Sequence, residues 1–307
     1  MRPAFSLTLV AAASALVLSS AGFAQQPAPA PAAPSATAPA ATPAQGQAGR
    51  GVGRGPPMAV SSALAAFDKD GPLKTRGYDE GRGCTIFRPE TLTGKSPIVL
   101  WGNGTGVTPA GYAGMLNQLA SHGFVVAAAN TTNAGTAVEM LECLKYLTEE
   151  NSRAGSRYEG KLDVSKVGAS GHSQGGGGAI MAGRDERVKT TAPIQPYTLR
   201  LGYEAGAQTR QHGPMLLLSG GADTIARPEP NQKPVFDEAN VPVFWATLAD
   251  ASHLVPMQPD SGSFRPAIIA WFRYQLMDDR QAAALFTGPA CGLCTASDWT
   301  VQRKGGA

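Results

Sequence analysis

Short, continuous apolar runs alternate along the chain with longer segments in which apolar residues recur every three or four positions. The runs PIVLWG (97–102) and PMLLLSG (214–220) are apolar almost throughout and end in glycine, which is typical of strands buried on both faces of a parallel sheet. The helical spacing is clearest in 137–148. The predicted strands are 84–89, 97–102, 124–129, 166–171, 188–194, 214–220 and 241–248, and the predicted helices are 112–122, 137–148, 174–182 and 266–277.

This alternation predicts an α/β fold in which helices cover both faces of a mostly parallel sheet. Ligands of such folds bind beyond the carboxyl ends of the strands. The loops in which to seek chemistry therefore follow Gly102, Gly171, Ile194, Gly220 and Leu248. The tail, residues 278–307, has a less regular pattern.

The first 57 residues have a different composition. Residues 1–24 carry Arg2, an apolar run over 7–18 and small residues before Ala24, the pattern of a secretory signal peptide. That run is shorter than the roughly 20 residues of a membrane span, so a transmembrane anchor is the weaker alternative. Residues 25–57 are rich in Pro and Ala, then in Gly and Arg, which predicts a disordered linker.

These boundaries leave residues 58–307 as one predicted catalytic or binding domain, without an integral membrane span, in a chain that is secreted or periplasmic. The chain has 26 Lys and Arg residues, three of them within the first 57 positions, so the domain carries 23 basic against 23 acidic residues. Because a nucleic-acid binder should show a basic patch, no nucleic-acid partner is predicted. We expect a monomer.

The four cysteines are Cys84, Cys143, Cys291 and Cys294, and an exported chain permits disulfides among them. Three pairings are possible, and the sequence does not choose among them. The CGLC motif near the end is interpreted as structural, because a redox motif belongs at the start of a helix early in the fold. A zinc site would need a second pair of ligands, so no metal is predicted.

The motif Gly171-His172-Ser173-Gln174-Gly175 is a G-x-S-x-G sequence between a predicted strand and a predicted helix. That context is typical of a nucleophile elbow, in which a sharp turn exposes the serine above the sheet. A plain glycine turn or a phosphate loop is the alternative, but no Lys-Ser or Lys-Thr follows. Ser173 is therefore the predicted nucleophile, and Gly176–Gly178 are predicted to let the helix pack closely on its neighbours.

A serine nucleophile needs a base and an orienting acid, which follow it in the order acid, then histidine. His253 follows the strand 241–248 and is the predicted base, whereas His212 precedes a strand and lies at the wrong end of the sheet. His122 is expected to cap a helix. His172 is expected to point away from Ser173 and to have a structural role.

The acid should follow the strand 214–220, where Asp223 lies. Asp250, three residues before the histidine, is the competitor. Two backbone N–H groups must hold the developing oxyanion: one from Gln174, after the nucleophile, and one from the glycine-rich loop after 97–102. Thr105 is the preferred second donor, and Gly104 and Gly106 remain alternatives.

Four segments, LASHGFVV, GHSQGGGGA, ADTIA and DASHLVP, together resemble the secreted cutinase-like polyester hydrolases, in the dienelactone-hydrolase branch of the α/β-hydrolase superfamily. The resemblance covers residues 97–277 and implies the α/β-hydrolase fold with the triad Ser173, Asp223 and His253. It also implies that Tyr197, where a tryptophan is usual, binds substrate together with Gly104.

Two positions depart from that family's pattern. Thr105 stands where an aromatic residue is usual and Gln174 where a methionine is common, which makes the cleft less apolar. We therefore predict an exported serine esterase that needs no cofactor and acts on small or polymeric carboxylic esters. The alternatives are a carbohydrate esterase removing acetyl or feruloyl groups, a lipase, and a catalytically silent binding protein on the same fold.

Overall fold

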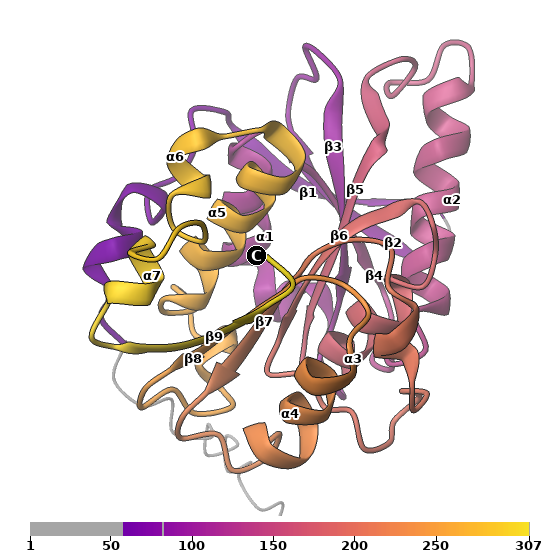
Figure 1. The fold of residues 1–307 in the computed structure, drawn as a ribbon. Helices are drawn as coiled ribbons and strands as arrows, with labels where there is room; N and C mark the ends of the chain where they lie inside the picture. The colour runs from indigo at the N-terminus through magenta and orange to yellow at the C-terminus, as the bar shows by residue number, and fades with distance from the viewer. Residues whose placement is uncertain (1–57, 82, 307) are drawn as a thin grey trace, which may run out of the picture. The chain divides into compact units, whose positions relative to one another are not determined.

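The computed structural model describes residues 58–81 and 83–306, so the predicted signal peptide and linker lie outside the described residues. Within this part, the strands form one sheet in the order β1-β2-β4-β3-β5-β6-β7-β8-β9 (Figure 1). The six strands from β3 to β8 are mutually parallel, whereas β1, β2 and β9 pair antiparallel at the edges. The strands are β1 Thr75–Glu80, β2 Cys84–Pro89, β3 Ser96–Gly102, β4 Val125–Ala129, β5 Leu162–His172, β6 Val188–Ile194, β7 Met215–Gly220, β8 Val243–Leu248 and β9 Trp299–Lys304.

Helices cover both faces of the sheet, because successive side chains of each strand point to opposite faces and both sets are apolar. In β4, Val126 and Ala128 belong to the core beneath α1 (Ala113–Ser121) and α5 (Phe264–Met277). Val125 and Ala127 belong to the core on the opposite face. That face carries α2 Val138–Ser152, α3 Gln174–Ala182 and α4 Pro228–Glu238.

Short helices complete the described part of the chain: α6 Arg280–Ala283, α7 Gly292–Thr295, and the 3₁₀-helices η1 Ser62–Phe67, η2 Pro109–Tyr112, η3 Ala207–Arg210 and η4 Val255–Met257. Among the described residues, no helix is long and apolar enough to cross a membrane.

The strand order places a functional crevice between two particular strands. The chain runs from β3 through α1 to β4 on one side, and then through α2 to β5 on the other side of β3. Helices that leave adjacent strands toward opposite faces open a crevice at the carboxyl ends of those strands. The loop after β3 and the turn after β5 therefore meet at one point.

The predicted fold class is confirmed: this is an α/β-hydrolase fold with a mostly parallel sheet and helices on both faces. The prediction for the tail, residues 278–307, needs correction. No regular element is predicted there, but β9 pairs with β8 along its whole length. Edge strands need only one apolar face, and the residues of β9 are mostly exposed or half-buried, so no apolar run marks it. The same reason accounts for β1, which was also missed.

Two disulfides lie within the described residues. One joins Cys84 of β2 to Cys143 of α2, and the other joins Cys291 to Cys294 at the short helix α7. The first bridge joins positions 59 residues apart and ties a strand to a helix, whereas the second closes a single turn, and the structural interpretation of CGLC stays a prediction.

The glycines of α3 explain how closely this helix lies to its neighbours. A Cβ atom on Gly175 would meet the carbonyl oxygen of Gly102 at 2.1 Å, and one on Gly178 would meet that of Ala134 at 2.1 Å. Both distances are far inside van der Waals contact. The helix presses on the end of β3 and on the loop after β4, so larger residues do not fit here.

Candidate active site

Ser173 lies at a sharp turn between β5 and α3. Its φ of 57° and ψ of −120° are uncommon for a residue with a side chain, and such strain persists only where the surroundings hold it. The backbone of Ser173 donates to the carbonyl of Ile194 (3.0 Å) and accepts from the N–H groups of Gly177 (3.0 Å) and Tyr197 (2.9 Å). These bonds fix the turn and leave the hydroxyl facing the crevice.

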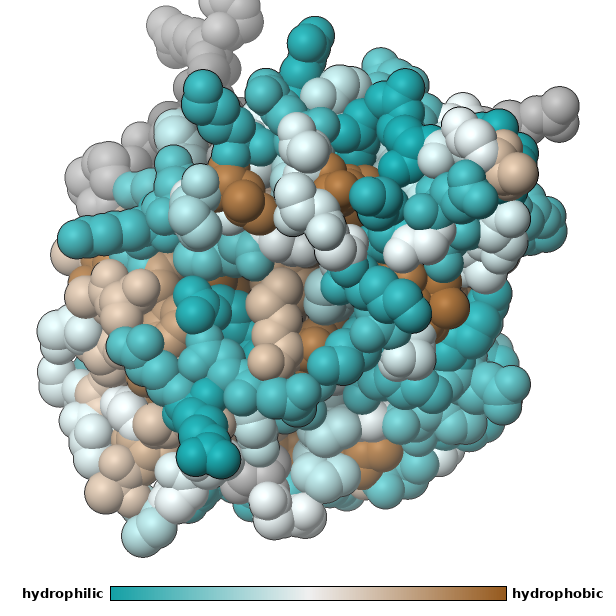
Figure 2. All heavy atoms as spheres, turned by 90° about the horizontal axis from the view of Figure 1, so that it is seen from above, coloured by the Kyte–Doolittle hydropathy of each residue, from teal (hydrophilic) through white to brown (hydrophobic). Residues whose placement is uncertain are grey.

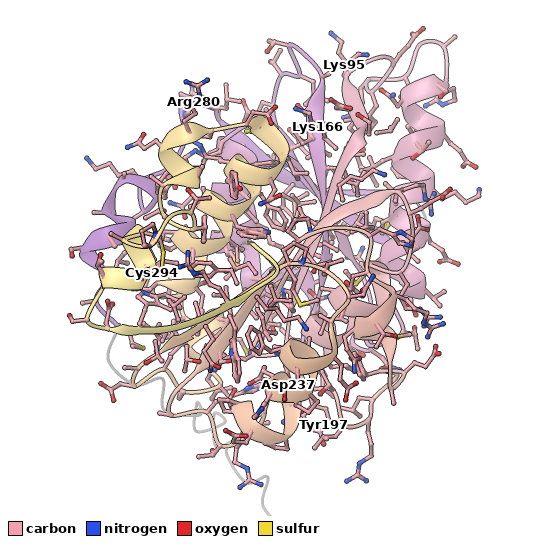
Figure 3. All side chains as sticks on the ribbon, viewed as in Figure 1. Lys95, Lys166, Tyr197, Asp237, Arg280 and Cys294 are labelled. Atoms are coloured by element: carbon pink, nitrogen blue, oxygen red, sulfur yellow. A yellow bond between two sulfur atoms is a disulfide. The ribbon has the colours of Figure 1, made fainter. Side chains whose placement is uncertain are left out.

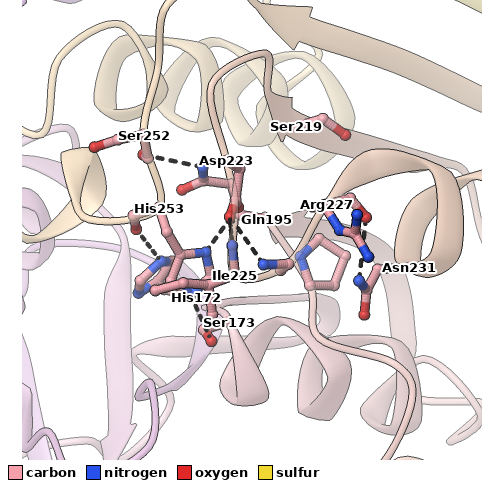
Figure 4. Close-up of polar contacts among 12 residues, drawn as sticks. His172, Ser173, Gln195, Ser219, Asp223, Ile225, Arg227, Asn231, Ser252 and His253 are labelled. Carbon is pink, nitrogen blue, oxygen red and sulfur yellow. Dashed lines mark hydrogen bonds and ion pairs between the residues drawn. The ribbon is translucent and has the colours of Figure 1, made fainter.

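Three side chains from three loops form a continuous hydrogen-bonded row (Figure 4). The Nε2 atom of His253, after β8, is 2.8 Å from Ser173 Oγ, and its Nδ1 atom is 2.7 Å from Asp223 Oδ2, after β7. A carboxylate accepts, so Nδ1 carries the proton and the lone pair of Nε2 faces the serine hydroxyl. This is the arrangement in which a histidine removes the proton of a serine.

Asp223 is held by its own loop. Its second oxygen, Oδ1, accepts from the backbone N–H groups of Ile225 and Ala226, at 2.8 Å each. The carboxylate is buried and cannot rotate away from the imidazole without losing these bonds. Asp250, the competitor, is exposed and has no hydrogen bond to His253 in the described part of the chain.

Two backbone N–H groups beside Ser173 have no acceptor among the described residues, namely those of Thr105 and Gln174. Gln174 is the first residue of α3, where N–H groups lack intrahelical partners and the helix end is positive. The N–H groups on either side of Thr105 already have acceptors: Gly104 donates to Tyr112 Oη (3.2 Å) and Gly106 donates to the carbonyl of Thr132 (3.1 Å). Among the three candidate donors of this loop, the described residues provide an acceptor for the N–H of Gly104 and of Gly106 but not for that of Thr105.

The side chains of these two residues are joined. Thr105 Oγ1 donates to Gln174 Oε1 at 3.1 Å. The Nε2 atom of Gln174 donates to Asn133 Oδ1 and, at 3.0 Å, to the carbonyl of Leu201. Every polar atom of the Gln174 side chain is engaged, so it supports the walls of the crevice instead of presenting a free group to a ligand.

A pocket of about 270 Å³ opens beside Ser173. Tyr197, half-buried, lies on its wall, as does Gly104. The rest of the lining is largely apolar, and three of its side chains are unusually exposed for their type: Leu201 (44 %), Ile225 (56 %) and Leu254 (37 %). An apolar pocket with few polar groups at its base is typical of a site for small organic ligands.

Apolar side chains gather at this end of the molecule. Tyr197 lies at the end opposite Lys95, which precedes β3 (Figure 3). Figure 2 shows the face at the Lys95 end, which is mostly hydrophilic with small separate hydrophobic spots. Among the described residues, no group of three or more His, Cys, Asp or Glu side chains is arranged to hold a metal ion.

The three other histidines make contacts to backbone carbonyls. His122 is the C-cap residue of α1, as predicted, and His212 is exposed and bonds to the carbonyl of Arg184. Burial lowers the pKa of His122 below its usual value. His172 is buried and makes no hydrogen bond to Ser173 in the described structure, but it contacts the carbonyl of His253 at 2.9 Å.

Sequence reasoning missed Tyr112 and Gln195. Tyr112 is buried between the loop after β3 and His172, and Gln195 donates to the carbonyl of Ser252 at 3.1 Å. Gln195 has a φ of 43°, uncommon for glutamine, directly after β6. Neither residue lies in a recognisable motif, and their roles follow from contacts across 57 or more positions of the chain.

A model of the family described as "PETase: PET hydrolase-like" matches residues 47–301. The chain is 27 % identical over 222 residues to Cutinase 1 of Thermobifida cellulosilytica (69 % of this chain, 80 % of that protein). It is 28 % identical over 226 residues to Cutinase est2 of Thermobifida alba (71 % and 72 %). It is 26 % identical over 234 residues to the bis(hydroxyethyl) terephthalate hydrolase of Streptomyces coelicolor (74 % and 69 %).

Proposed function

The chain belongs to the PET hydrolase-like family, and we propose from this that it is an exported serine esterase that hydrolyses carboxylic esters. The observation that carries the proposal is the hydrogen-bonded row of Ser173, His253 and Asp223, next to two backbone N–H groups that have no acceptor in the described part of the chain. The family membership and the cutinase and terephthalate-ester hydrolase relatives support ester cleavage.

In the first half of the reaction, Ser173 Oγ attacks the ester carbonyl while its proton passes to His253 Nε2. Asp223 stabilises the imidazolium that forms and keeps the ring oriented. The N–H groups of Thr105 and Gln174 donate to the oxyanion of the tetrahedral intermediate, and such donors are worth about 3–4 kcal/mol each in serine hydrolases. The C–O bond then breaks, and His253 gives its proton to the leaving alcohol.

In the second half, water attacks the acyl-enzyme. His253 removes a proton from the water, the oxyanion forms again at the same two N–H groups, and the acid leaves as Ser173 recovers its proton. Every proton is carried by His253, and no step requires a metal or an organic cofactor.

The pocket supports esters with an apolar acyl group. Leu201, Ile225 and Leu254 offer exposed apolar surface around the serine, and the ring of Tyr197 can stack on a flat acyl group. Aromatic esters, including terephthalate esters and their polymers, fit this surface better than acetylated polysaccharides, whose recognition needs free hydrogen-bonding groups. The side chain of Gln174 offers none.

Export is supported by the signal-peptide pattern of residues 1–24 and by the two disulfides, which persist in oxidising compartments. We place the mature chain, which would begin after residue 24, outside the cytoplasm, with the linker 25–57 followed by a monomeric domain from residue 58.

The test is hydrolysis of p-nitrophenyl butyrate, bis(hydroxyethyl) terephthalate, acetylated xylan and poly(ethylene terephthalate) film by the wild type and by Ser173→Ala. We expect turnover of the first two substrates by the wild type and none by the variant. Equal inertness of both proteins would favour the binding-protein alternative. Preference for acetylated xylan would replace the proposed substrate class, and activity confined to soluble esters would exclude polymers alone.

A further inference from the structure

Beneath the pocket, four groups from separate segments form a buried hydrogen-bonded chain. The N–H of Gly104 lies 3.2 Å from Tyr112 Oη, which lies 2.8 Å from His172 Nδ1. His172 Nε2 in turn lies 2.9 Å from the carbonyl oxygen of His253. Tyr112 and His172 are each only 2 % exposed, so water does not compete for these bonds.

The direction of each bond is determined by its neighbours. The carbonyl of His253 can only accept, so His172 carries its proton on Nε2. Burial, together with the neighbouring His253, lowers the pKa of His172 well below its usual value, so the ring is neutral and its Nδ1 accepts. Tyr112 therefore donates to Nδ1, and its oxygen accepts from Gly104. Burial also raises the pKa of Tyr112, so the hydroxyl keeps its proton.

This hydrogen-bonded chain connects two parts of the proposed site, the loop after β3 and the segment of His253, whose relative position matters for the reaction. At one end, it engages the N–H of Gly104, the residue before Thr105, whose own N–H has no acceptor among the described residues. At the other end, it holds the backbone of His253, whose ring centroid lies 4.7 Å from that of His172. Tyr112 and His172 lie directly against the loop, because a Cβ atom on Gly104 would meet Tyr112 Oη at 2.9 Å and His172 Nδ1 at 3.3 Å.

We propose that Tyr112 and His172 are positioning residues, which fix the oxyanion-binding loop and the general base relative to each other through this chain. The proposal rests on the proposed esterase function. Neither residue exchanges a proton with the substrate, and each acts through the placement of Thr105 and His253.

The first test is Tyr112→Phe, which keeps the ring and removes the hydroxyl that links Gly104 to His172. We expect kcat on p-nitrophenyl butyrate to fall about tenfold with KM changed less than twofold, because misplaced groups weaken the transition state more than ground-state binding. The matched control is Tyr158→Phe, which removes a hydroxyl that also makes two hydrogen bonds but lies in the segment before β5. That control should lower the unfolding midpoint and leave kcat at the wild-type value.

The second test separates the two hydrogen bonds of His172, one to Tyr112 and one to the carbonyl of His253. His172→Phe removes both bonds, whereas His172→Gln places an amide donor where Nε2 stood and can restore the bond to the carbonyl of His253. We expect the glutamine variant to recover part of the kcat lost in the phenylalanine variant. If His172→Phe does not fold, the comparison of Tyr112→Phe with Tyr158→Phe still decides the question.

A wild-type kcat in Tyr112→Phe, with Ser173→Ala inactive, would overturn the positioning role while leaving the esterase intact. Equal losses of kcat in Tyr112→Phe and Tyr158→Phe would also overturn it, because general destabilisation would then explain both. Wild-type activity in Ser173→Ala would instead remove the proposed function on which the inference rests.

Discussion

The hydroxyl of Thr105 and the amide of Gln174 join the two residues whose backbone N–H groups have no acceptor among the described residues. The link couples the loop after β3 to the start of α3, and Gln174 extends it to Asn133 and Leu201. In a site that excludes part of the solvent, such a link keeps two donors at a fixed separation, which is what stabilisation of an oxyanion needs.

Thr105→Val removes this link and keeps the β-branched shape. We expect kcat on p-nitrophenyl butyrate to fall about three- to tenfold, with little change in KM, because the donor remains but is less well held. Thr148→Val in α2 is the control, since its hydroxyl bonds only within its own helix and its loss should leave kcat unchanged. Equal effects of the two substitutions would mean that the link has no part in catalysis.

The two aspartates of the sequence analysis are separable in the same assay. Asp223→Asn places an amide against Nδ1 of His253 and favours the wrong tautomer, so we expect kcat to fall on the order of 10³–10⁴-fold, as in other serine hydrolases. Asp250→Asn should retain nearly full activity, since Asp250 is exposed and its φ of 55° suits asparagine. A larger loss in Asp250→Asn than in Asp223→Asn would reverse the assignment.

For single residues, the sequence was sufficient where a side chain of the required chemistry also follows a predicted strand. Ser173, Asp223 and His253 each follow a predicted strand, and the structure brings them into hydrogen-bond distance. Tyr112 and Gln195 could not be found in this way, because nothing local marks a buried hydroxyl or amide that bonds to a distant loop. The choice of Thr105 over Gly104 likewise depends on which N–H groups are already paired in three dimensions.

Among the elements, those buried on both faces were predictable and those at the edges were not. The strand β7 is apolar at nearly every position and was placed within one residue. The helix α4 was missed because it is polar overall and contains Pro234, so it lacks the pattern of a covering helix. The paired residues of β8 and β9 are 51 to 61 positions apart in sequence, and such distant pairing leaves no local trace in a polar edge strand.

The helix α3 provides a case in which propensity and packing predict opposite signs. Alanine in place of Gly178 should stabilise an isolated helix by about 1 kcal/mol. Its Cβ atom, however, would meet the backbone carbonyl oxygen of Ala134 at 2.1 Å and the Met140 sulfur at 3.4 Å. We expect Gly178→Ala to lower the free energy of unfolding by about 1–3 kcal/mol, as overpacking does.

Urea unfolding followed by circular dichroism measures this effect. Gly94→Ala is the control, because nothing lies within 4 Å of the added Cβ atom and no loss is expected. A Gly178→Ala variant more stable than the wild type would show that the loop after β4 yields to the helix, and the close packing of α3 would then not require glycine.

For the molecule as a whole, the strand order and the distribution of apolar surface agree on one active end. The crevice between β3 and β5, the loops carrying Asp223 and His253, and the exposed apolar side chains Leu201 and Ile225 all lie at the carboxyl ends of the strands. The opposite face is mostly hydrophilic (Figure 2). Because the apolar surface lies at the end that carries Ser173, we expect this end to contact an apolar ester surface.

Buried His172 makes the stability of the domain depend on pH. His172 has a folded-state pKa well below its usual value, chiefly because it is buried, and Tyr112 and His253 are the titratable side chains packed against it. In the unfolded chain this histidine titrates near 6.5. Below that pH the unfolded state binds a proton that the folded state does not, so the stability present above pH 6.5 is lost as the pH falls.

Between pH 7 and pH 5, His172 should lower the free energy of unfolding as the pH falls, with a slope of at most about 1.4 kcal/mol per pH unit. His122, whose pKa is also lowered by burial, adds to the loss. Urea titrations at pH 7, 6 and 5 measure the slope, and in His172→Gln it should decrease by about one proton. An unchanged slope in His172→Gln would mean that His172 is protonated in the folded state, and the bond directions derived for the chain from Gly104 to His253 would then be wrong.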